Sequence, residues 1–342
     1  MSATVIAGLG GYVPPRAVGN ETFAARLGVT DEWIRSRIGT SRRHFAGEGV
    51  ATAALAVEAG RCALASAGYE TCDVVLLATT TPDRTCPATA PEVAWRLGLE
   101  TAAACDVSAV CAGFVYAISL ARGLIAAGDA RSVLVIGAEA VSTIVDPDDR
   151  ATAAVFGDGA GALVLRAGAP DESGAVVGVD LGSDGAHSDL LQVPAGGSRL
   201  PATPDVPQRD RFMIMNGPEI YRHAVRRMAS SSRKVLDRAG WRTSDIEVLV
   251  VHQANRRILG AVARDLDIPA QRVARNLERV GNTSAASIPL ALSHAADEGL
   301  LTADARVLLT AFGGGLSWGS VALTWPTVTV VAPTLFADRT SD

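Results

Sequence analysis

The feature that most constrains the fold of this chain is an internal repeat with a period close to half its length. In the 342-residue sequence, residues 67–82 read AGYETCDVVLLATTTP and residues 239–254 read AGWRTSDIEVLVVHQA. The two segments agree at Ala, Gly, Thr, Asp and Leu. A second pair follows in the same order, GDARSVLVIGAE from Gly128 and ADARVLLTAFGG from Ala303. Two ordered matches predict two related halves built on one plan.

Each copy of the first repeat begins as a helix closes and an apolar strand follows. Gly68 and Gly240 stand just after the last helical turn, where a left-handed residue is needed and glycine adopts it without strain. A segment containing Pro, Gly and Ser, residues 167–174, separates the two copies. We therefore expect an N-terminal half of residues 1–170 and a C-terminal half of residues 171–342.

Apolar, β-branched runs alternate with Ala-rich helical stretches along both halves. Runs that are apolar on both faces are typical of a sheet covered by helices on each side. We predict such strands at residues 73–79, 104–107, 132–137, 162–165, 247–251, 307–311 and 321–325. The sequence thus predicts an α/β fold.

Composition matters chiefly for what it excludes. The net charge is −5 without a run of like charges, so nothing indicates nucleic-acid binding. No leader-like start and no membrane-length apolar run is evident, so we expect a cytoplasmic protein that does not enter the membrane. The five cysteines lack zinc-binding spacing, and we expect most to be buried fillers without disulfides.

Cys111 follows a predicted strand and a tight turn of small residues, at the start of a helix expected to reach about Ala127. Unpaired backbone N–H groups and the positive end of the helix dipole favour a thiolate there and lower the pKa of a thiol. Such a thiolate can accept an acyl group. A buried packing cysteine is the alternative, and the local sequence leaves both interpretations open.

Three further patterns are weak when taken singly. His252 ends an apolar strand before an arginine-rich helix, where a structural histidine is the commoner case. Asn282 reads as a helix N-cap. The glycine run at residues 313–315 suits an oxyanion hole, although a flexible turn explains it equally well. The G-x-G-x-G within residues 156–161 enters a strand instead of following one, so we reject it as a nucleotide-binding loop.

Together, five segments resemble the family of β-ketoacyl-acyl carrier protein synthase III, an initiating condensing enzyme of the thiolase superfamily. These are DVSAVCAGFVYAIS with Cys111, VVHQANRRIL with His252, VGNTSAASIPLAL with Asn282, FGDGAGA and AFGGGLSWGS. The resemblance runs from about Val5 to Trp325. It implies a thiolase-like fold, with duplicated βαβαβ halves in a five-layered αβαβα arrangement, and a homodimer.

The resemblance also implies a reaction. Acyl-CoA would load its acyl group onto Cys111, with the N–H groups of Cys111 and Gly314 holding the oxyanion. Malonyl-acyl carrier protein would then lose CO₂, and His252 and Asn282 would stabilise the enolate that attacks the acyl-cysteine. The product is a 3-ketoacyl-carrier protein, and neither a metal nor another cofactor is needed.

Several substrate contacts are implied only by the same resemblance. Trp33 and Arg37 match the segment that packs on the adenine of coenzyme A, and Arg150 would close its other face. Basic positions that meet the phosphates of coenzyme A or the acidic carrier protein are matched by Arg222, Arg257 and Arg264. An ordinary solvated face is the alternative for these arginines, and a core-packing anchor is the alternative for Trp33.

Cys86 matches a position on a loop that crosses the dimer interface toward the partner's acyl pocket. Acetyl-preferring relatives have phenylalanine there, so the smaller cysteine predicts a larger or branched starter group, unless a neighbouring side chain fills the space.

Two other functions stay open. They are an acyltransferase of this fold that does not condense and a noncatalytic partner subunit. The sequence does not separate fatty-acid initiation from priming of a polyketide, and it assigns no role to residues 327–342.

Overall fold

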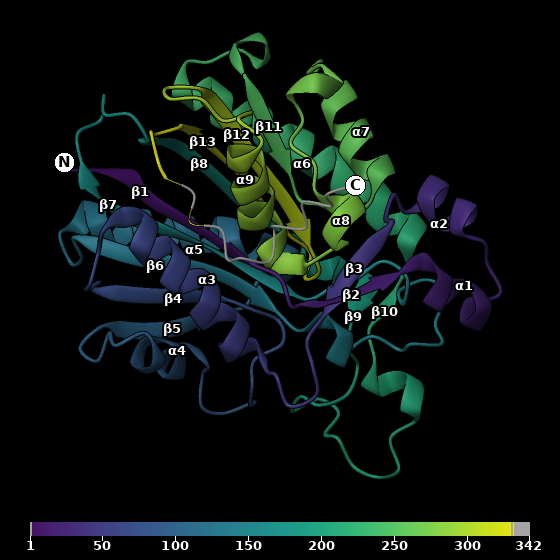
Figure 1. Cartoon of the computed structure of the whole chain (residues 1–342). Helices are drawn as coiled ribbons and strands as arrows, with labels where there is room; N and C mark the ends of the chain where they lie inside the picture. Colours follow the sequence, from purple (N-terminus) through teal and green to yellow (C-terminus); the bar gives the residue numbers. More distant parts are fainter. Residues whose placement is uncertain (1, 330, 332–342) are drawn as a thin grey trace, which may run out of the picture.

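The computed structural model describes residues 2–329 and residue 331, and its centre is a pair of stacked β-sheets (Figure 1). The N-terminal sheet has the order β1-β7-β6-β4-β5 and the C-terminal sheet the order β11-β12-β13-β8. Their strands are β1 (Ala3–Tyr12), β4 (Val74–Ala78), β5 (Ala103–Val107), β6 (Ser132–Glu139), β7 (Gly159–Gly168), β8 (Val176–Ser183), β11 (Val248–Val251), β12 (Arg306–Gly313) and β13 (Ser317–Thr324).

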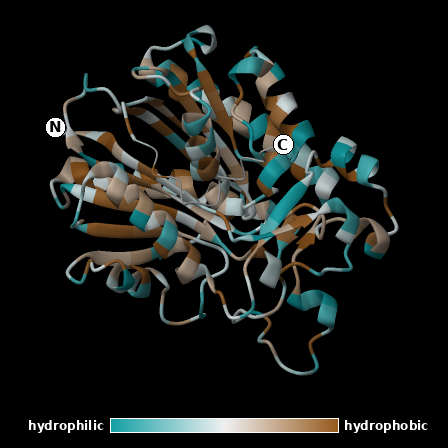
Figure 2. Cartoon of the chain, viewed as in Figure 1, coloured by the Kyte–Doolittle hydropathy of each residue, from teal (hydrophilic) through white to brown (hydrophobic). Residues whose placement is uncertain are grey.

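Helices lie between the sheets and on both outer faces, which gives five layers. The inner pair, α5 (Gly113–Ala127) and α9 (Ser287–Asp297), shares one apolar core with strands of both sheets. Helices α3 (Thr52–Ala67) and α4 (Ala90–Arg96) pack against the outer face of the N-terminal sheet. Helices α6 (Gly217–Ala239) and α7 (Arg256–Asp265) cover the C-terminal sheet. Figure 2 shows the matching pattern, with hydrophobic strands inside and hydrophilic helix faces outside.

The two sheets repeat each other's connections. In each, a central strand pairs in parallel with one neighbour and antiparallel with the other: β6 with β4 and β7, and β12 with β11 and β13. The predicted αβαβα fold of duplicated halves is confirmed. The helix-ending glycines Gly68 and Gly240 are both left-handed, with φ of 67° and 68°.

All seven strands predicted from apolar runs are present, whereas β1 and β8 were not predicted. Strand β1 contains three glycines, a composition that weakens the strand pattern. The reason is close packing on α3: a Cβ atom on Gly8 or Gly10 would lie 2.4 or 2.3 Å from a carbonyl oxygen of that helix. Contact with the neighbouring helix therefore sets the composition of this strand.

Smaller elements gather beside the sheets and frame one end of the inner layer. They are β2 (Arg16–Gly19), β3 (Arg42–Phe45), α1 (Asn20–Leu27), α2 (Asp31–Arg37), β9 (Leu191–Gln192), β10 (Ile214–Met215) and α8 (Leu277–Val280). Between β9 and β10 the proline-containing segment 194–211 extends away from both sheets at the bottom of the view, as a surface loop (Figure 1).

One described helical segment, Val110–Ala127, is long and apolar enough to span a membrane by length and composition alone. Half of it is buried inside the protein, and a helix packed between two sheets meets the same criterion. Its hydrophobicity is accounted for by its place in the inner layer.

Candidate active site

Cys111 lies just before the N-terminus of α5, in the connection that leads from β5 into this helix. A short 3₁₀ turn, Val110–Ala112, joins the two elements. Val110 has φ of 48°, a left-handed conformation that a β-branched residue adopts only when its surroundings enforce it. The expected helix to Ala127 is confirmed, and it starts directly after this turn.

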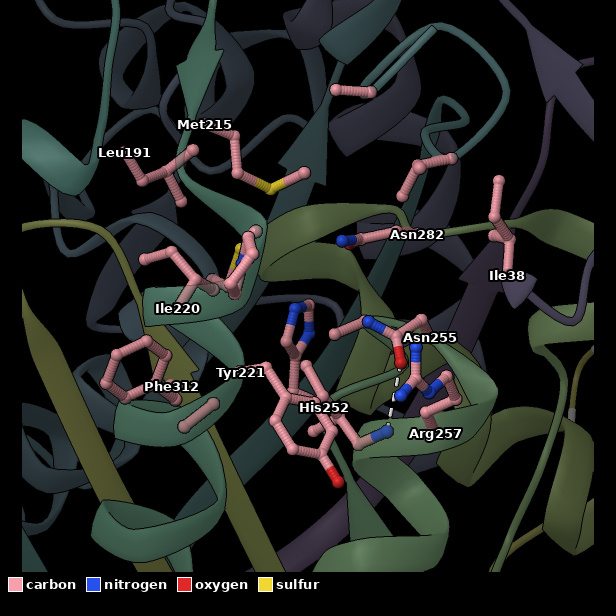
Figure 3. Close-up of a pocket in the computed structure, with 18 of the residues that line it drawn as sticks. Ile38, Leu191, Met215, Ile220, Tyr221, His252, Asn255, Arg257, Asn282 and Phe312 are labelled. Atoms are coloured by element: carbon pink, nitrogen blue, oxygen red, sulfur yellow. Dashed lines mark hydrogen bonds between the residues drawn. The ribbon is translucent and has the colours of Figure 1, made fainter.

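A pocket of about 660 Å³ opens over this turn. Cys111, His252 and Asn282 all line it, although they come from three separate parts of the chain. Figure 3 shows two of them, His252 and Asn282, in the pocket. The remaining wall is mainly apolar and includes Ile38, Val155, Phe156, Leu191, Met215, Ile220, Tyr221, Met228 and Phe312. An apolar cavity with a few convergent polar groups is the usual form of a small-molecule site.

His252 stands at the end of β11, where the strand gives way to the helix α7. Its Nδ1 atom lies 2.6 Å from the Ser287 Oγ atom, so Nε2 is the ring nitrogen left for a ligand. The side chain is buried, and burial lowers its pKa to about 3. His252 is therefore neutral near pH 7.

Asn282 is buried in the opposite wall. Its Oδ1 atom accepts a hydrogen bond of 2.9 Å from the N–H of Ser284. This bond leaves the Nδ2 group as a donor, and Figure 3 shows the amide nitrogen directed toward the cavity. The prediction of a helix N-cap at Asn282 is wrong, because Thr283 precedes the 3₁₀ turn Ser284–Ala286 and that turn has no side-chain cap. The bond from the N–H of Ser284 instead fixes the orientation of the Asn282 amide.

The thiol of Cys111 does not have the lowered pKa that the sequence predicted. It is fully buried, and burial raises the pKa to about 12, aided by the negative charge of Glu139. A hydrogen bond to the Ser284 hydroxyl, 3.5 Å away, acts in the other direction. Desolvation of the thiolate outweighs the favourable helix terminus.

The glycine run lies beside the cysteine turn, at the end of β12. A Cβ atom on Gly313 would lie 2.7 Å from the backbone nitrogen of Cys111, so this position requires glycine. Gly313 lines the pocket, whereas Gly314 stands next to it against the Leu191 carbonyl, where a Cβ atom would come within 2.9 Å.

The predicted coenzyme A contacts gather at the mouth of the pocket, with two exceptions. The pocket is lined by Trp33, Arg37, Arg222 and Arg257. Arg264 is not among the lining residues, and neither is Arg150.

Arg150 instead covers the ring of Trp33, with its guanidinium carbon 4.6 Å from the ring centroid. A flat ring can enter between these two groups only if they separate.

Cys86 is exposed and does not line the pocket of its own chain. The expectation that most cysteines are buried fillers was wrong, because only Cys72 and Cys111 are buried while Cys105 is exposed like Cys86. All five cysteines are free. Among the described residues, no cluster of three or more His, Cys, Asp or Glu side chains could hold a metal ion.

Sequence reasoning missed three polar residues around the thiol and the imidazole: Glu139, Ser284 and Ser287. Glu139 closes a strand in which every residue is buried, and a carboxylate at the end of such a strand is itself a signal. The two serines lie in the segment after Asn282, where their composition is typical of a turn and their contacts depend on the fold.

Comparisons with known proteins agree along the chain. The family profile described as "3-Oxoacyl-[acyl-carrier-protein (ACP)] synthase III" matches residues 105–185, and the profile of its C-terminal region matches residues 236–325. A Streptomyces coelicolor protein named beta-ketoacyl-[acyl-carrier-protein] synthase III 5 is 56% identical over 330 residues, covering 96% of this chain and 99% of that protein.

Solved structures show the same relationship. The 3-oxoacyl-(acyl carrier protein) synthase III of Pseudomonas aeruginosa has a TM-score of 0.89 and 50% identity, covering 96% of this chain and 99% of that one. The priming β-ketosynthase of a polyketide biosynthetic pathway has a TM-score of 0.87 and 32% identity, covering 95% of this chain and 97% of its own.

Proposed function

This chain belongs to the 3-oxoacyl-[acyl-carrier-protein] synthase III family, and from that premise we propose that it is an initiating ketoacyl synthase whose reaction runs through Cys111, His252 and Asn282. The enzyme transfers an acyl group from acyl-CoA to itself and condenses it with malonyl-acyl carrier protein. The observation that carries the residue assignment is that one pocket gathers a thiol, a neutral imidazole and a free amide donor from three distant segments.

In the loading step, the Cys111 sulfur attacks the thioester carbonyl and coenzyme A leaves. The developing oxyanion is held by backbone N–H groups, which we assign to Cys111 and Gly314. The packing of Gly313 on the Cys111 nitrogen supports this assignment, because it brings the glycine turn against the cysteine turn without an intervening side chain.

In the condensation step, loss of CO₂ places negative charge on the thioester oxygen of the carrier protein. His252 and Asn282 would each donate a hydrogen bond to that oxygen. A neutral imidazole whose Nδ1 atom accepts from Ser287 carries its proton on Nε2, as this role requires. The Asn282 amide is oriented by Ser284.

Trp33, Arg37, Arg150, Arg222, Arg257 and Arg264 are proposed to bind coenzyme A or the carrier protein. Four of them line the mouth of the pocket, which supports the assignment. Arg150 and Trp33 would separate to admit the adenine between a guanidinium and an indole, two planes suited to a purine.

We also propose a homodimer in a cytoplasmic setting. The edge strand β5 has exposed residues, and Trp95 nearby is 68% exposed. Cys86 is also exposed and does not line the pocket of its own chain, so this side of the N-terminal half suits a second copy. Five free cysteines fit a reducing compartment. A boundary between the halves near residue 170 is supported by its position between β7 and β8.

The test is intact-protein mass spectrometry after incubation with a panel of acyl-CoAs, followed by malonyl-carrier protein and a measurement of CO₂. We expect an acyl adduct on the Cys111 peptide that disappears with CO₂ release. Transfer of the acyl group without CO₂ would identify a non-condensing acyltransferase, and failure of every acyl-CoA to load would indicate a noncatalytic subunit.

A further inference from the structure

Glu139 is a buried carboxylate close to the reactive thiol, and the reaction as described does not use it. The side chain has no exposed surface, and among the described residues no arginine, lysine or histidine forms an ion pair with it. Burying a carboxylate without a cation is unfavourable by several kcal/mol unless hydrogen bonds replace its hydration. A group kept in such a place is a candidate for a chemical role.

Hydrogen bonds do surround Glu139, some from backbone N–H groups that can only donate and the others from hydroxyls that donate to it. The N–H groups of Thr80 and Thr81 lie 3.0 and 3.2 Å from its Oε2 atom. The hydroxyls of Thr80 and Thr81 lie 3.0 and 2.9 Å from its oxygens, and the Ser284 hydroxyl lies 2.9 Å from Oε1. Such a set of donors stabilises the ionised carboxylate, which only accepts hydrogen bonds.

Ser284 connects this carboxylate to the thiol. Its single hydroxyl proton is directed to Glu139, so its lone pair is free to accept the S–H of Cys111 at 3.5 Å. Ser284 has φ of 49° and is held there by the bond from its N–H to Asn282. The side chain is therefore fixed between a proton donor and a proton acceptor.

His252, the other base in the pocket, is poorly suited to take the thiol proton. Its Nδ1 atom already contacts Ser287, and burial lowers its pKa to about 3. Burial acts on Glu139 in the opposite sense and raises its pKa above the ordinary value, which makes its carboxylate a stronger base. Among the described residues, Glu139 is the charged group that acts on the thiol.

Building on the function proposed above, we propose that Glu139 accepts the Cys111 proton through the Ser284 hydroxyl during acyl loading. As the sulfur bonds to the acyl carbon, the S–H proton passes to the Ser284 oxygen and the Ser284 proton passes to Glu139. Coenzyme A leaves as a thiolate and takes a proton from solvent. In condensation, the new carbon–carbon bond expels the Cys111 thiolate, which recovers its proton from Glu139 by the same path.

This assignment gives the transfer of the thiol proton to Ser284 and Glu139 and leaves the enolate to Asn282 and His252. The experiment measures single-turnover acyl loading by intact mass spectrometry between pH 6 and pH 10 in the parent, Ser284→Ala and Glu139→Gln. We expect both variants to load ~100-fold more slowly near pH 7. We expect the deficit to shrink toward pH 10, because hydroxide then removes the thiol proton directly.

A matched control is Thr80→Val, which removes another hydroxyl from the same carboxylate oxygen but not from the path to Cys111. We expect this control to keep the pH profile of the parent. Ser284→Ala deletes one atom, so it keeps the test decisive if Glu139→Gln does not fold.

Three results would overturn the relay: equal loading by the parent and Ser284→Ala, a deficit of the same size at every pH, or faster thiol alkylation and loading in Glu139→Gln. The last would mean that the Glu139 charge merely suppresses the thiolate. Failure of the parent itself to load any acyl-CoA would instead contradict the proposed function, so the two failures are distinguishable.

Discussion

The two halves of the molecule have the same strand order near their centres, but different residue types stand at the ends of the equivalent strands. In the aligned repeats Thr80 follows β4, while His252 follows β11. At the next strand, Glu139 ends β6 and Gly314 follows the end of β12. The N-terminal half thus supplies the proposed nucleophile and a buried acid. The C-terminal half supplies an imidazole, an amide and a glycine turn.

The turns that lead into the two inner helices make the comparison closer. Val110 opens the turn before α5 and Ser284 opens the turn before α9, with φ of 48° and 49°. One left-handed residue places a thiol one position later, and the other places a hydroxyl against that thiol. Duplicated geometry thus positions two different groups that meet at the pseudo-twofold centre.

The sheets differ most at their edges. In the N-terminal half, β5 pairs in parallel with β4 over five residues. In the C-terminal half, the corresponding place beside β11 holds a single bridge between Leu249 and Val273. Strand β5 therefore has no full counterpart beside β11. Because an edge strand can pair with another chain, we expect dimerisation to use the N-terminal half.

The division of labour predicts that the largest single loss follows removal of the thiol. Cys111→Ala should abolish acyl loading, because no other side chain in the pocket can form the thioester. Mass spectrometry of the intact protein with acyl-CoA measures this. Cys72→Ala, which removes another buried cysteine of the same half, should load normally. An acyl adduct on the corresponding peptide of Cys111→Ala would contradict the assignment.

Substitutions in the C-terminal half should separate the two half-reactions. Asn282→Ala should still load acyl groups yet condense ~100-fold more slowly, because its hydrogen bond matters only when enolate charge develops. His252→Ala should show a similar pattern, with a partial loss of loading if the imidazole also affects the thiol. Single-turnover loading and CO₂ release report the two steps separately. Equal losses in both steps for Asn282→Ala would break the proposed division between halves.

In acid, the buried His252 of the C-terminal half and the buried Glu139 of the N-terminal half should change the free energy of unfolding in opposite directions. The pKa of His252 is lowered to about 3 in the folded protein, so the unfolded chain binds its proton first. The associated stability is complete above pH ~6.5 and is lost as the pH falls from there toward 3. Glu139 has a raised pKa, so lowering the pH through that pKa favours the folded state.

When the pH falls from 6.5 to 4, we therefore expect the free energy of unfolding to decrease less in His252→Gln than in the parent. The difference should be a few kcal/mol. Urea unfolding at a series of pH values measures the difference. Parallel curves for the parent and His252→Gln would show that the imidazole is not held neutral by burial.

The repeat, the apolar strands and the glycine caps could be predicted because they depend on local composition and period. The glycine-rich strand β1 could not be predicted, because its glycines are required by close contact with α3. Cys111 and Asn282 were found by motif, yet the direction of the Cys111 pKa shift was missed. A helix terminus is visible in sequence, whereas burial and the neighbouring Glu139 exist only in the fold.

The halves also differ in the loop after β4, and from this difference we predict the smallest effect, a change in the preferred acyl group. In the C-terminal half the chain passes from His252 into α7 within four residues, whereas in the N-terminal half a longer loop carries Cys86 to the surface. If a second copy covers this face, Cys86 would approach the partner's acyl pocket. A small side chain there leaves room for a larger starter group.

We expect the parent to load butyryl- or isobutyryl-CoA in preference to acetyl-CoA, and Cys86→Phe to shift the preference toward acetyl. One or two methylene groups in an apolar pocket are worth ~1–3 kcal/mol, so the result should be a preference and not an exclusion. Loading rates for the three substrates measure it, with Cys86→Ala as the control because it keeps the position small. A parent that favours acetyl, or an unshifted profile in Cys86→Phe, would mean that the Cys86 loop does not shape the pocket. The structural difference between the halves would then carry no substrate selectivity.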